Sequence, residues 1–329
     1  ATLDGLYYNW PAPAIDLDGK NYIIIRNFKL FGGAGNDGII RLTKNDGASV
    51  GVQILNNEIA FGQYTGIYAN NSTSNITISG NTIHDVVTGT YTISSVGQVF
   101  SGWTVSNNEV YDGSPNSTLR GTASDRHALG GQDINNSTFE SNYIHDWAGD
   151  GILDYSSSGG EASNIVVRYN RIINLNDPIS QNHHYGIALT GTNAANFGTR
   201  MGGWQIYNNI LSNINAGAAG TAAGDGAAIR LKGNPNPLIY NNIIRDFISG
   251  TEITLVTGFD VGIQITSKNN AFISPKTGGY YYYLPSSAGG NATIANNNLY
   301  YPDTSASDNL FRWSGSNSTS FTDWQSDST

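Results

Sequence analysis

The sequence predicts an all-β chain wound into a right-handed parallel β-helix of about ten coils. A short phrase, Asn-x-(Ile/Val/Leu)-x-(Asp/Asn), recurs at intervals from 24 residues (Asn57 to Asn81) to 39 residues (Asn170 to Asn209). An alternating apolar segment precedes each phrase, and a further apolar segment, usually opened by Gly, follows it after a loop. A fixed phrase at such intervals is typical of stacked repeats, in which each coil packs on the next.

The phrase has clear and looser copies. The clear copies are Asn81–Asp85, Asn108–Asp112, Asn142–Asp146 and Asn242–Asp246, and the looser ones begin at Asn27, Asn57, Asn170, Asn209, Asn270 and Asn298. A repeated amide can bond to the next coil, so we expect an internal ladder of Asn81, Asn108, Asn142, Asn170, Asn209 and Asn242. The repeated Asp is expected to be a turn residue, because Asp bonds its own backbone at bends.

Each repeat carries three short strands. Alternation in segments such as Ile76–Ile78 and Trp103–Val105 indicates a strand with one face buried. The second half of the phrase supplies another strand, and the Gly-opened segments, such as Gly151–Leu153 and Gly262–Gln264, supply the third. Parallel crossovers strongly prefer the right-handed form.

One domain is expected to fill the chain. We assign residues 15–300 to the coils, residues 1–14 to an N-terminal cap and residues 301–329 to a C-terminal cap. The run Tyr280–Tyr283 has two interpretations: an aromatic cap over the end of the stack, or a platform that binds sugars.

The composition of the chain argues against several classes of binding partner. The net charge of −9 argues against nucleic acid and anionic membranes, and the absence of Cys excludes disulfides and thiolate metal sites. No apolar run is long enough to cross a membrane. The chain opens at Ala1 and its single Met is Met201, so we expect a mature secreted or cell-surface monomer whose signal peptide is not in this sequence.

The Gly-opened strands define a candidate surface. Their outward positions, counted from the inward apolar residues, are Arg41, Tyr68, Tyr155, Thr190, Arg230, Lys232 and Gln264. Arg230 and Lys232 place two cations on one face beside long loops, which indicates either a site for an anion or an ordinary exposed strand. Tyr68, Arg41, Gln264 and Trp147 are the candidate substrate-binding residues.

Histidines and carboxylates form a second candidate group. Asp125 and His127 precede the coil that carries Asp154 and Tyr155, and His183 and His184 follow one coil later. Stacking would bring these residues to similar corners, which favours acid–base chemistry. His84 and His145 lie within the phrase, so we interpret them as structural.

A calcium site is a third expectation. Asp150 and Asp225 each precede a Gly-opened strand, and with Asp133 they could surround Ca²⁺ with oxygen ligands. Asp before Gly is also common in turns that hold no metal. No other cofactor is expected.

The pattern resembles the right-handed β-helix proteins that act on polysaccharides: pectate and alginate lyases, chondroitinase-type lyases and mannuronan epimerases. Asp125-Arg126-His127, then His145-Asp146, then Asp150 to Asp154 is similar to the epimerase active-site region, where Asp-Pro-His is followed by His-Asp and by Asp-Gly with a further Asp. The resemblance implies that Asp125, His127 and Asp154 are catalytic or bind substrate.

The resemblance has two departures. Arg126 replaces the Pro of the motif, and Thr122 and Ala123 lie where the family has its catalytic Tyr. Tyr155 or Tyr185 would have to take that role.

The leading functional hypothesis is an enzyme that removes the proton at carbon 5 of a uronate, leading to β-elimination or epimerisation. Arg230 would neutralise the sugar carboxylate, and Lys232, His127 or His184 would be the base. Tyr155 would protonate the leaving oxygen.

Two other classes stay open. A glycoside hydrolase could use paired carboxylates from Asp125, Asp133, Asp150 and Asp154. A non-catalytic glycan-binding adhesin or phage-tail domain would use the solenoid as a rigid surface.

Overall fold

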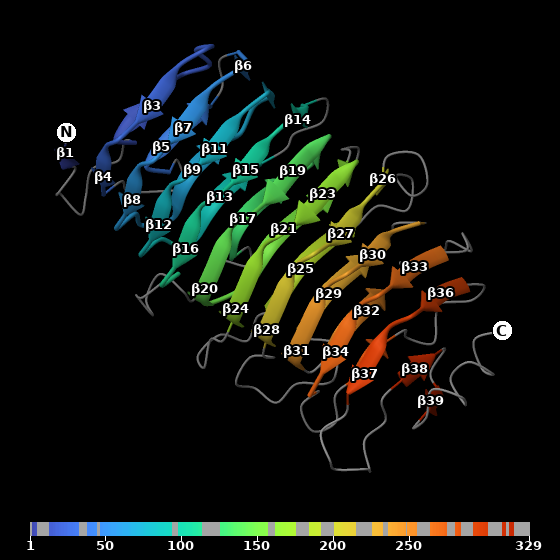
Figure 1. Ribbon diagram of the computed structural model, residues 1–329. Coiled ribbons are helices and arrows are strands. Elements are labelled where there is room, and N and C mark those ends of the chain that lie inside the picture. Colours follow the sequence, from blue (N-terminus) through green and yellow to red (C-terminus); the bar gives the residue numbers. More distant parts are fainter. Residues whose placement is uncertain are drawn as a thin grey trace.

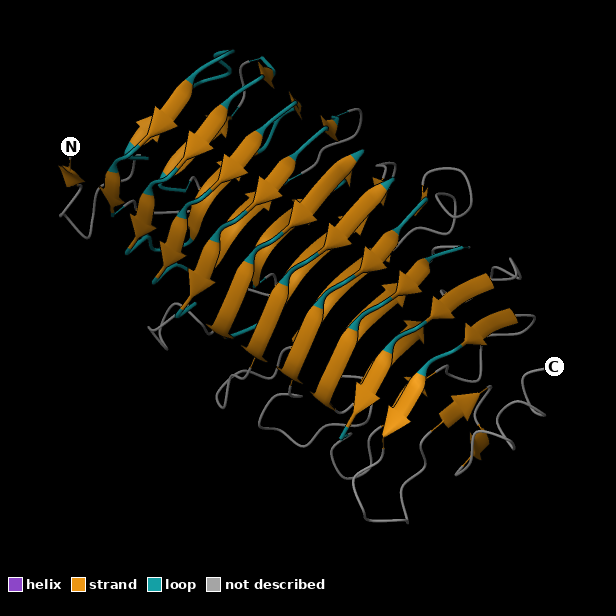
Figure 2. Cartoon of the chain, in the orientation of Figure 1, coloured by secondary structure: helices purple, strands orange, loops and turns teal. Residues whose placement is uncertain are grey.

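The computed structural model describes residues 2–4, 13–32, 38–44, 47–93, 98–113, 126–156, 162–175, 184–191, 201–214, 226–232, 236–247, 249–254, 264–274, 280–283, 292–301, 311–313 and 316–318. Strands run across one elongated stack from the N-terminal to the C-terminal end (Figure 1), and no helix is present in these ranges (Figure 2). The predicted all-β parallel β-helix is confirmed. None of the described segments is a helix able to cross a membrane.

Two long sheets form two sides of the coil. The eleven-stranded sheet consists of β1 (Thr2–Asp4), β4 (Lys29–Phe31), β8 (Glu58–Ala60), β12 (Thr82–His84), β16 (Glu109–Tyr111), β20 (Tyr143–Trp147), β24 (Arg171–Leu175), β28 (Ile210–Ile214), β31 (Ile243–Phe247), β34 (Ala271–Ile273) and β37 (Leu299–Tyr301). The ten-stranded sheet consists of β3 (Ile24–Arg26), β7 (Gln53–Leu55), β11 (Thr77–Ser79), β15 (Thr104–Ser106), β19 (Ser137–Glu140), β23 (Ile165–Arg168), β27 (Gln205–Tyr207), β30 (Leu238–Tyr240), β33 (Gln264–Lys268) and β36 (Ala292–Asn296).

The third side is built in two parts. A four-stranded sheet holds β2 (Ile15–Asp16), β5 (Ile40–Thr43), β9 (Thr65–Ala69) and β13 (Thr88–Thr92). An eight-stranded sheet holds β17 (His127–Gln132), β21 (Asp150–Ser156), β25 (His184–Gly191), β29 (Gly226–Lys232), β32 (Ser249–Thr254), β35 (Tyr280–Tyr283), β38 (Phe311–Trp313) and β39 (Ser316–Ser318). Thr90 joins the two parts, because its Oγ1 donates to the Gly130 carbonyl and accepts from the Gly130 N–H.

Short bridges complete the coils. One small sheet contains β6 (Ser49–Val50), β10 (Thr73–Ser74), β14 (Phe100–Ser101) and β18 (Ile134–Asn135), and another contains β22 (Ala162–Ser163) and β26 (Met201–Gly202). The pairings between described strands are parallel up to β38, which pairs with β39 in the antiparallel sense.

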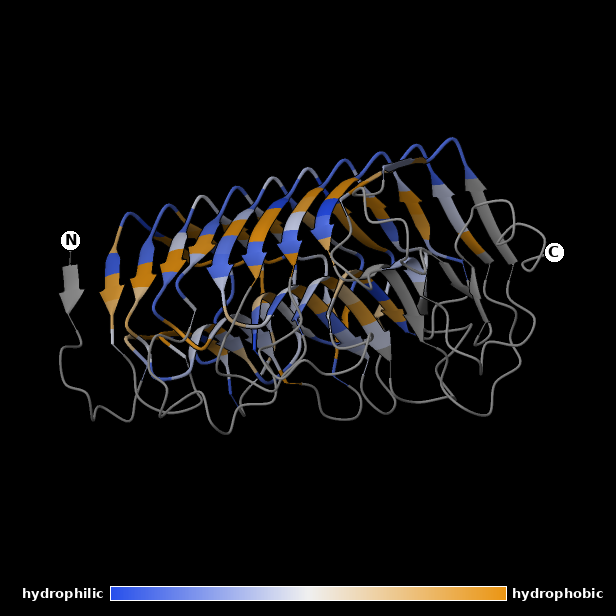
Figure 3. Cartoon of the chain, turned by 90° about the horizontal axis from the view of Figure 1, so that it is seen from below, coloured by the Kyte–Doolittle hydropathy of each residue, from blue (hydrophilic) through white to orange (hydrophobic). Residues whose placement is uncertain are grey.

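The inside of the coils is a single apolar column. Equivalent residues stack in register from strand to strand, as Ile78 does on Val105 and Val105 on Phe139. Figure 3 shows hydrophobic colour along the strands and hydrophilic colour repeating at the corner of coil after coil. Burying the inward row drives the stack together, because no single coil can cover its own apolar face.

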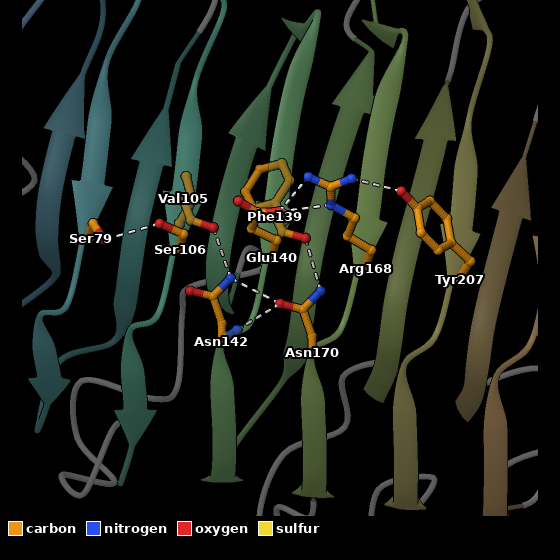
Figure 4. A network of polar contacts seen from close by, with 9 residues as sticks. All are labelled: Ser79, Val105, Ser106, Phe139, Glu140, Asn142, Arg168, Asn170 and Tyr207. Atoms are coloured by element: carbon orange, nitrogen blue, oxygen red, sulfur yellow. Dashed lines mark hydrogen bonds and ion pairs between the residues drawn. The ribbon is translucent and has the colours of Figure 1, made fainter.

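The predicted asparagine ladder is confirmed at the corner between the two long sheets. Asn142 Nδ2 donates to the Val105 carbonyl at 2.9 Å and to Asn170 Oδ1 at 2.9 Å. Its Oδ1 accepts from the N–H and the Nδ2 of Asn108 at 3.1 and 3.0 Å. Figure 4 shows this step of the ladder. The same bonds connect Asn57, Asn81, Asn108, Asn142, Asn170, Asn209, Asn242, Asn270 and Asn298.

Asn27 lies one residue out of register. The Phe28 N–H donates to Asn57 Oδ1, so Phe28 occupies the ladder position in that coil. Asn27 instead has a left-handed backbone with φ of 60°. The repeated aspartates are turn residues as predicted: Asp85, Asp112, Asp146 and Asp246 have φ between 48° and 53°.

The tyrosine run belongs to the interior. β35 pairs with β32 and β38, and Tyr281 and Tyr282 are fully buried against Phe272 and Tyr300. Burial excludes these two rings as a sugar platform. Within the expected caps, β1 joins the eleven-stranded sheet and β38 and β39 extend the third side; residues 5–12 and 319–329 lie outside the described residues.

One carboxyl interrupts the apolar column. Asp154 is 0% exposed and faces inward in register with Leu189, where its Oδ1 accepts from the Ile134 N–H at 3.1 Å. Burial, with a contribution from nearby Asp133, raises the pKa of the Asp154 carboxyl well above its usual range. The carboxyl is a structural group of the core, which corrects its placement at an outward corner.

We predict that Asn142→Ala lowers the free energy of unfolding by about 3 kcal/mol, because Asn108 and the Val105 carbonyl lose buried partners. Asn107→Gly is the matched control, because Asn107 is exposed with φ of 56°, which glycine adopts freely. Denaturant unfolding measures the free energy of unfolding of both variants. Equal losses would show that the buried ladder bonds of Asn142 do not stabilise the fold more than an exposed turn residue does.

We predict that Asp154→Asn stabilises the protein at pH 8 by at least about 1 kcal/mol and that the gain shrinks towards pH 4. The unfolded carboxyl ionises near pH 4, whereas the folded one, with its raised pKa, stays neutral to higher pH. The wild type therefore loses stability as pH rises through this window, and the amide does not. Asp112→Asn, which makes the same replacement at an exposed turn, is the control.

Candidate functional site

A row of polar side chains crosses the outward face of the third side. His127 of β17 is the register partner of Asp150 of β21. The next strand, β25, is held by Asp150, whose Oδ1 accepts from the Tyr185 N–H at 2.8 Å. Tyr185 in turn pairs with Ala227 of β29. One residue per coil is thus brought into a line, although the residues lie far apart in the sequence.

Arg230 reaches into this row from β29. Its Nη1 donates to Tyr185 Oη, and its guanidinium carbon lies 4.5 Å from the centre of the Tyr185 ring. A guanidinium against a phenol oxygen stabilises the phenolate, which favours proton exchange at that oxygen. The same cation can also neutralise a sugar carboxylate.

The row is largely shielded from water. Tyr185, Ala188 and Ala227 form a small apolar cluster with Leu153 on this outer face. His127 and Tyr185 are buried, whereas Asp150 and Arg230 are partly exposed. Electrostatic interactions are stronger in such a setting than in bulk water, so one cation here has a large effect on nearby proton transfer.

Aromatic rings extend the row towards the N-terminal end. The Tyr91 ring meets His127 edge-on at 5.4 Å, and Tyr68 lies 6.4 Å from Tyr91. Tyr68 is buried and is the register partner of Arg41. Arg41 forms an ion pair with Asp16. The hydrogen bond that the guanidinium donates in this pair lowers the pKa of the Asp16 carboxyl.

Two of the predicted residues occupy the neighbouring outward rows. Lys232 follows Arg230 by two residues on the same face and is partly exposed. Tyr155 is also partly exposed and is the register partner of Thr190. His184 is buried directly before Tyr185 and pairs with Gly226. The structure therefore places Tyr185, rather than Tyr155, against Arg230.

Other predicted residues are placed elsewhere. Trp147 is fully buried inside the coil, which is incompatible with the substrate contact expected of it. Asp154 is inside as well. Gln264 opens β33 of the ten-stranded sheet, not a strand of the third side as expected. Asp125, His183 and Asp225 lie outside the described residues.

The residues expected to bind Ca²⁺ do not form a cluster in the part of the chain that the structure describes. Asp133 is buried at a turn with φ of 55°, next to Asp154, while Asp150 holds the Tyr185 N–H on the outer face. Within the described ranges, no group of three or more His, Cys, Asp or Glu residues could hold a metal ion.

The sequence predicts Tyr185 only as an alternative to Tyr155, and it does not predict a role for Tyr91. The signal for Tyr185 was available, because Asp150-Gly151 and Tyr185-Gly186 occupy the same place in successive repeats. Aligning the residue before each Gly would have put Tyr185 beside Asp150.

Comparison with known proteins identifies the architecture. A family model described as "right handed beta helix region" matches residues 13–199, more than half of the 329-residue chain. No curated protein matches the chain.

Solved structures align with this chain at low sequence identity. A periplasmic alginate epimerase, AlgG, aligns with a TM-score of 0.50 and 14% identity over 84% of this chain, which spans 60% of the epimerase. An alginate lyase from a Paenibacillus species aligns at 0.42 and 13% identity, covering 88% of this chain and 78% of the lyase. The tailspike protein of an E. coli bacteriophage, in complex with a pentasaccharide, aligns at 0.48 and 15% identity, covering 87% and 54%.

The repeat, the three parallel sides and the family match lead to one conclusion. The chain belongs to the right-handed β-helix family.

Proposed function

We propose that this protein is an enzyme that acts on an acidic polysaccharide by removing the proton at carbon 5 of a uronate. The observation that carries the proposal is the contact between Arg230 and Tyr185, in line with Asp150 and His127. The name of the structural neighbour, an alginate epimerase, supports a uronate-containing chain as the substrate class.

The chemistry requires a cation at the sugar carboxylate. The proton at carbon 5 is weakly acidic, and its removal leaves an enolate whose charge must be neutralised. Arg230 is partly exposed, and a planar guanidinium matches the geometry of a carboxylate. It therefore serves both the substrate and the phenol oxygen of Tyr185.

Tyr185 is the proposed proton-transfer group. The guanidinium at its oxygen favours the phenolate, which accepts the proton from carbon 5. Asp150 positions Tyr185 through the backbone N–H, and His127 lies in the same row but is fully buried, so it is a supporting residue of the row and not a group that contacts substrate. Return of a proton to the opposite face of carbon 5 gives epimerisation; departure of the oxygen at carbon 4 gives β-elimination.

The hydrolase hypothesis is weaker in this geometry. A hydrolase needs two carboxyl groups flanking the scissile bond. Asp133 and Asp154 are buried in the coil, which leaves Asp150 as the carboxylate that the described part of the outward row contributes. The remaining alternative is a non-catalytic glycan binder, and an activity assay distinguishes it from an enzyme.

The decisive assay is absorbance near 235 nm during incubation with alginate, pectate, glycosaminoglycans or ulvan, with and without calcium. Rising absorbance indicates a lyase and names its sugar. Constant absorbance with an altered uronate composition indicates an epimerase, and new reducing ends without absorbance indicate a hydrolase. No change in any polymer would contradict the proposal. Binding of Ca²⁺ stays a prediction, and loss of turnover after addition of a chelator would support it.

We predict that Tyr185→Phe lowers kcat by about 100-fold or more, because the phenol oxygen transfers the proton. The thermal transition should change little, because the ring and its packing remain. Tyr155→Phe is the matched control, being an outward tyrosine on the preceding strand. Loss of turnover in Tyr155→Phe alone would return the role to Tyr155.

We predict that Arg230→Gln lowers kcat/KM by about 100-fold or more on acidic polymers, because the carboxylate loses its cation. Lys232→Ala is the companion variant, since the sequence alone favours Lys232 as the base. Initial rates and thermal melts of both variants decide between them. Abolished turnover only in Lys232→Ala would make Lys232 the base and remove Arg230 from the chemistry.

A further inference from the structure

Three exposed aromatic residues have left-handed backbones. Among the described residues, the non-glycine positions with positive φ are otherwise Asn, Asp or Ser. The exceptions are Tyr22, Phe61 and Tyr169, with φ of 58°, 60° and 58° and exposures of 77%, 56% and 55%. Asn and Asp tolerate this conformation, whereas a bulky side chain does not, and such exceptions commonly mark function.

Tyr169 occupies the turn directly before a ladder asparagine. The equivalent residues of the other described coils are Asn27, Asn56, Gly80, Asn107, Ser141, Asn208, Asn241, Asn269 and Asn297. The turn therefore has no need for an aromatic ring, and the ring is open to solvent over more than half of the residue's surface. Folding alone does not account for a tyrosine at this position.

Tyr169 is the start of an aromatic ridge on the ten-stranded sheet. Its ring meets Tyr207 edge-on at 6.0 Å and 76°, and Tyr207 stacks on Tyr240 at 4.6 Å and 7°. Tyr207 and Tyr240 are in register on β27 and β30, and Lys268 of β33 follows them in register. The rings thus follow the helix axis from coil to coil, with an exposed cation at the far end.

Arg168 supports the end of the ridge at which Tyr169 lies. Its Nε and Nη2 contact Glu140 Oε2 at 2.7 and 2.6 Å, and its Nη1 donates to Tyr207 Oη at 2.9 Å. Figure 4 shows Arg168 between the carboxylate and the phenol. The guanidinium carbon also lies 5.8 Å from the centre of the Tyr169 ring. Held in this way, Arg168 and Tyr207 form a rigid support under the exposed ring of Tyr169.

We propose that Tyr169, Tyr207 and Tyr240, with Arg168 and Lys268, form a second binding surface for an acidic polysaccharide chain, on a different sheet from the Tyr185 row. The exposed ring of Tyr169 presents an apolar face to the carbon-bound hydrogens of a sugar ring, whereas Tyr207 and Tyr240, which stack face to face, offer ring edges and hydroxyls. Coils repeat about every 4.8 Å, a spacing comparable to one sugar unit, so a chain lying along the axis meets one tyrosine per coil.

Charge favours an anionic chain. Glu140 balances Arg168, which leaves Lys268 as the net positive charge of the ridge in a protein whose total charge is −9. The ligand class rests on the proposed function, but the surface does not include any residue of the Tyr185 row. Its role is to hold polymer, and the chemistry at Tyr185 is separate.

The test is retention in native gels that contain alginate, polygalacturonate or neutral dextran. Tyr169→Asn restores the residue type that other coils use, so it should leave the thermal transition unchanged or raise it. We expect Tyr169→Asn to weaken the apparent affinity for an acidic polymer about five- to tenfold, the loss typical of one stacking aromatic. Lys268→Gln should weaken it too, and dextran should not retain any variant.

Tyr22→Asn is the matched control. Tyr22 has the same backbone conformation and greater exposure, and no ring contact joins it to another aromatic among the described residues. Equal retention of Tyr169→Asn and wild type, or equal losses in Tyr169→Asn and Tyr22→Asn, would overturn the proposal. A lowered thermal transition in Tyr169→Asn would also overturn it, because the ring would then be a packing element.

Tyr185→Phe separates this inference from the proposed function. If the protein turns over none of the polymers but Tyr169→Asn still weakens retention, the second surface stands and the enzymatic proposal fails. If Tyr185→Phe loses turnover while Tyr169→Asn binds polymer like the wild type, the enzymatic proposal stands and the second surface fails.

Discussion

The amide-to-amide hydrogen bond at the asparagine corner holds successive coils in register. Each ladder amide donates to one neighbouring coil's carbonyl and to the next coil's amide oxygen, as Asn142 does with Val105 and Asn170. The bond fixes both the rise between coils and their rotation. Because a strand in a parallel stack pairs only with its equivalents, a coil slipped by one residue would leave these buried amides unpaired.

Fixed register turns one-dimensional repetition into rows on the surface. Side chains at equivalent positions of successive coils lie about 4.8 Å apart, so a site needs only one residue from each coil. The Tyr185 row uses β17, β21, β25 and β29 in this way, and the tyrosine ridge uses the turn directly after β23 together with β27 and β30. Both surfaces are rigid, because the ladder and the apolar column hold the strands that carry them.

The departures from the repeat are the informative positions. Asp154 replaces an aliphatic residue in the inward row, and Tyr169 replaces Asn, Ser or Gly at a left-handed turn. The first is a buried carboxyl with a raised pKa, and the second is an exposed ring in an unfavourable backbone conformation. Each works against stability, which folding alone would not select.

The repeat, the three sides of the coil and the roles of the recurring Asn and Asp could be predicted from the sequence, because they depend on local periodicity and on turn chemistry that every coil shares. Alternation from Ile152 also places Asp154 inward and Tyr155 outward, as observed; the resemblance to a catalytic motif argued otherwise for Asp154. Contacts between residues of different coils follow from the folded structure and not from local sequence. Loops of different lengths separate the strands, so counting along the chain put Gln264 on the wrong side of the coil and left Tyr185 apart from Arg230.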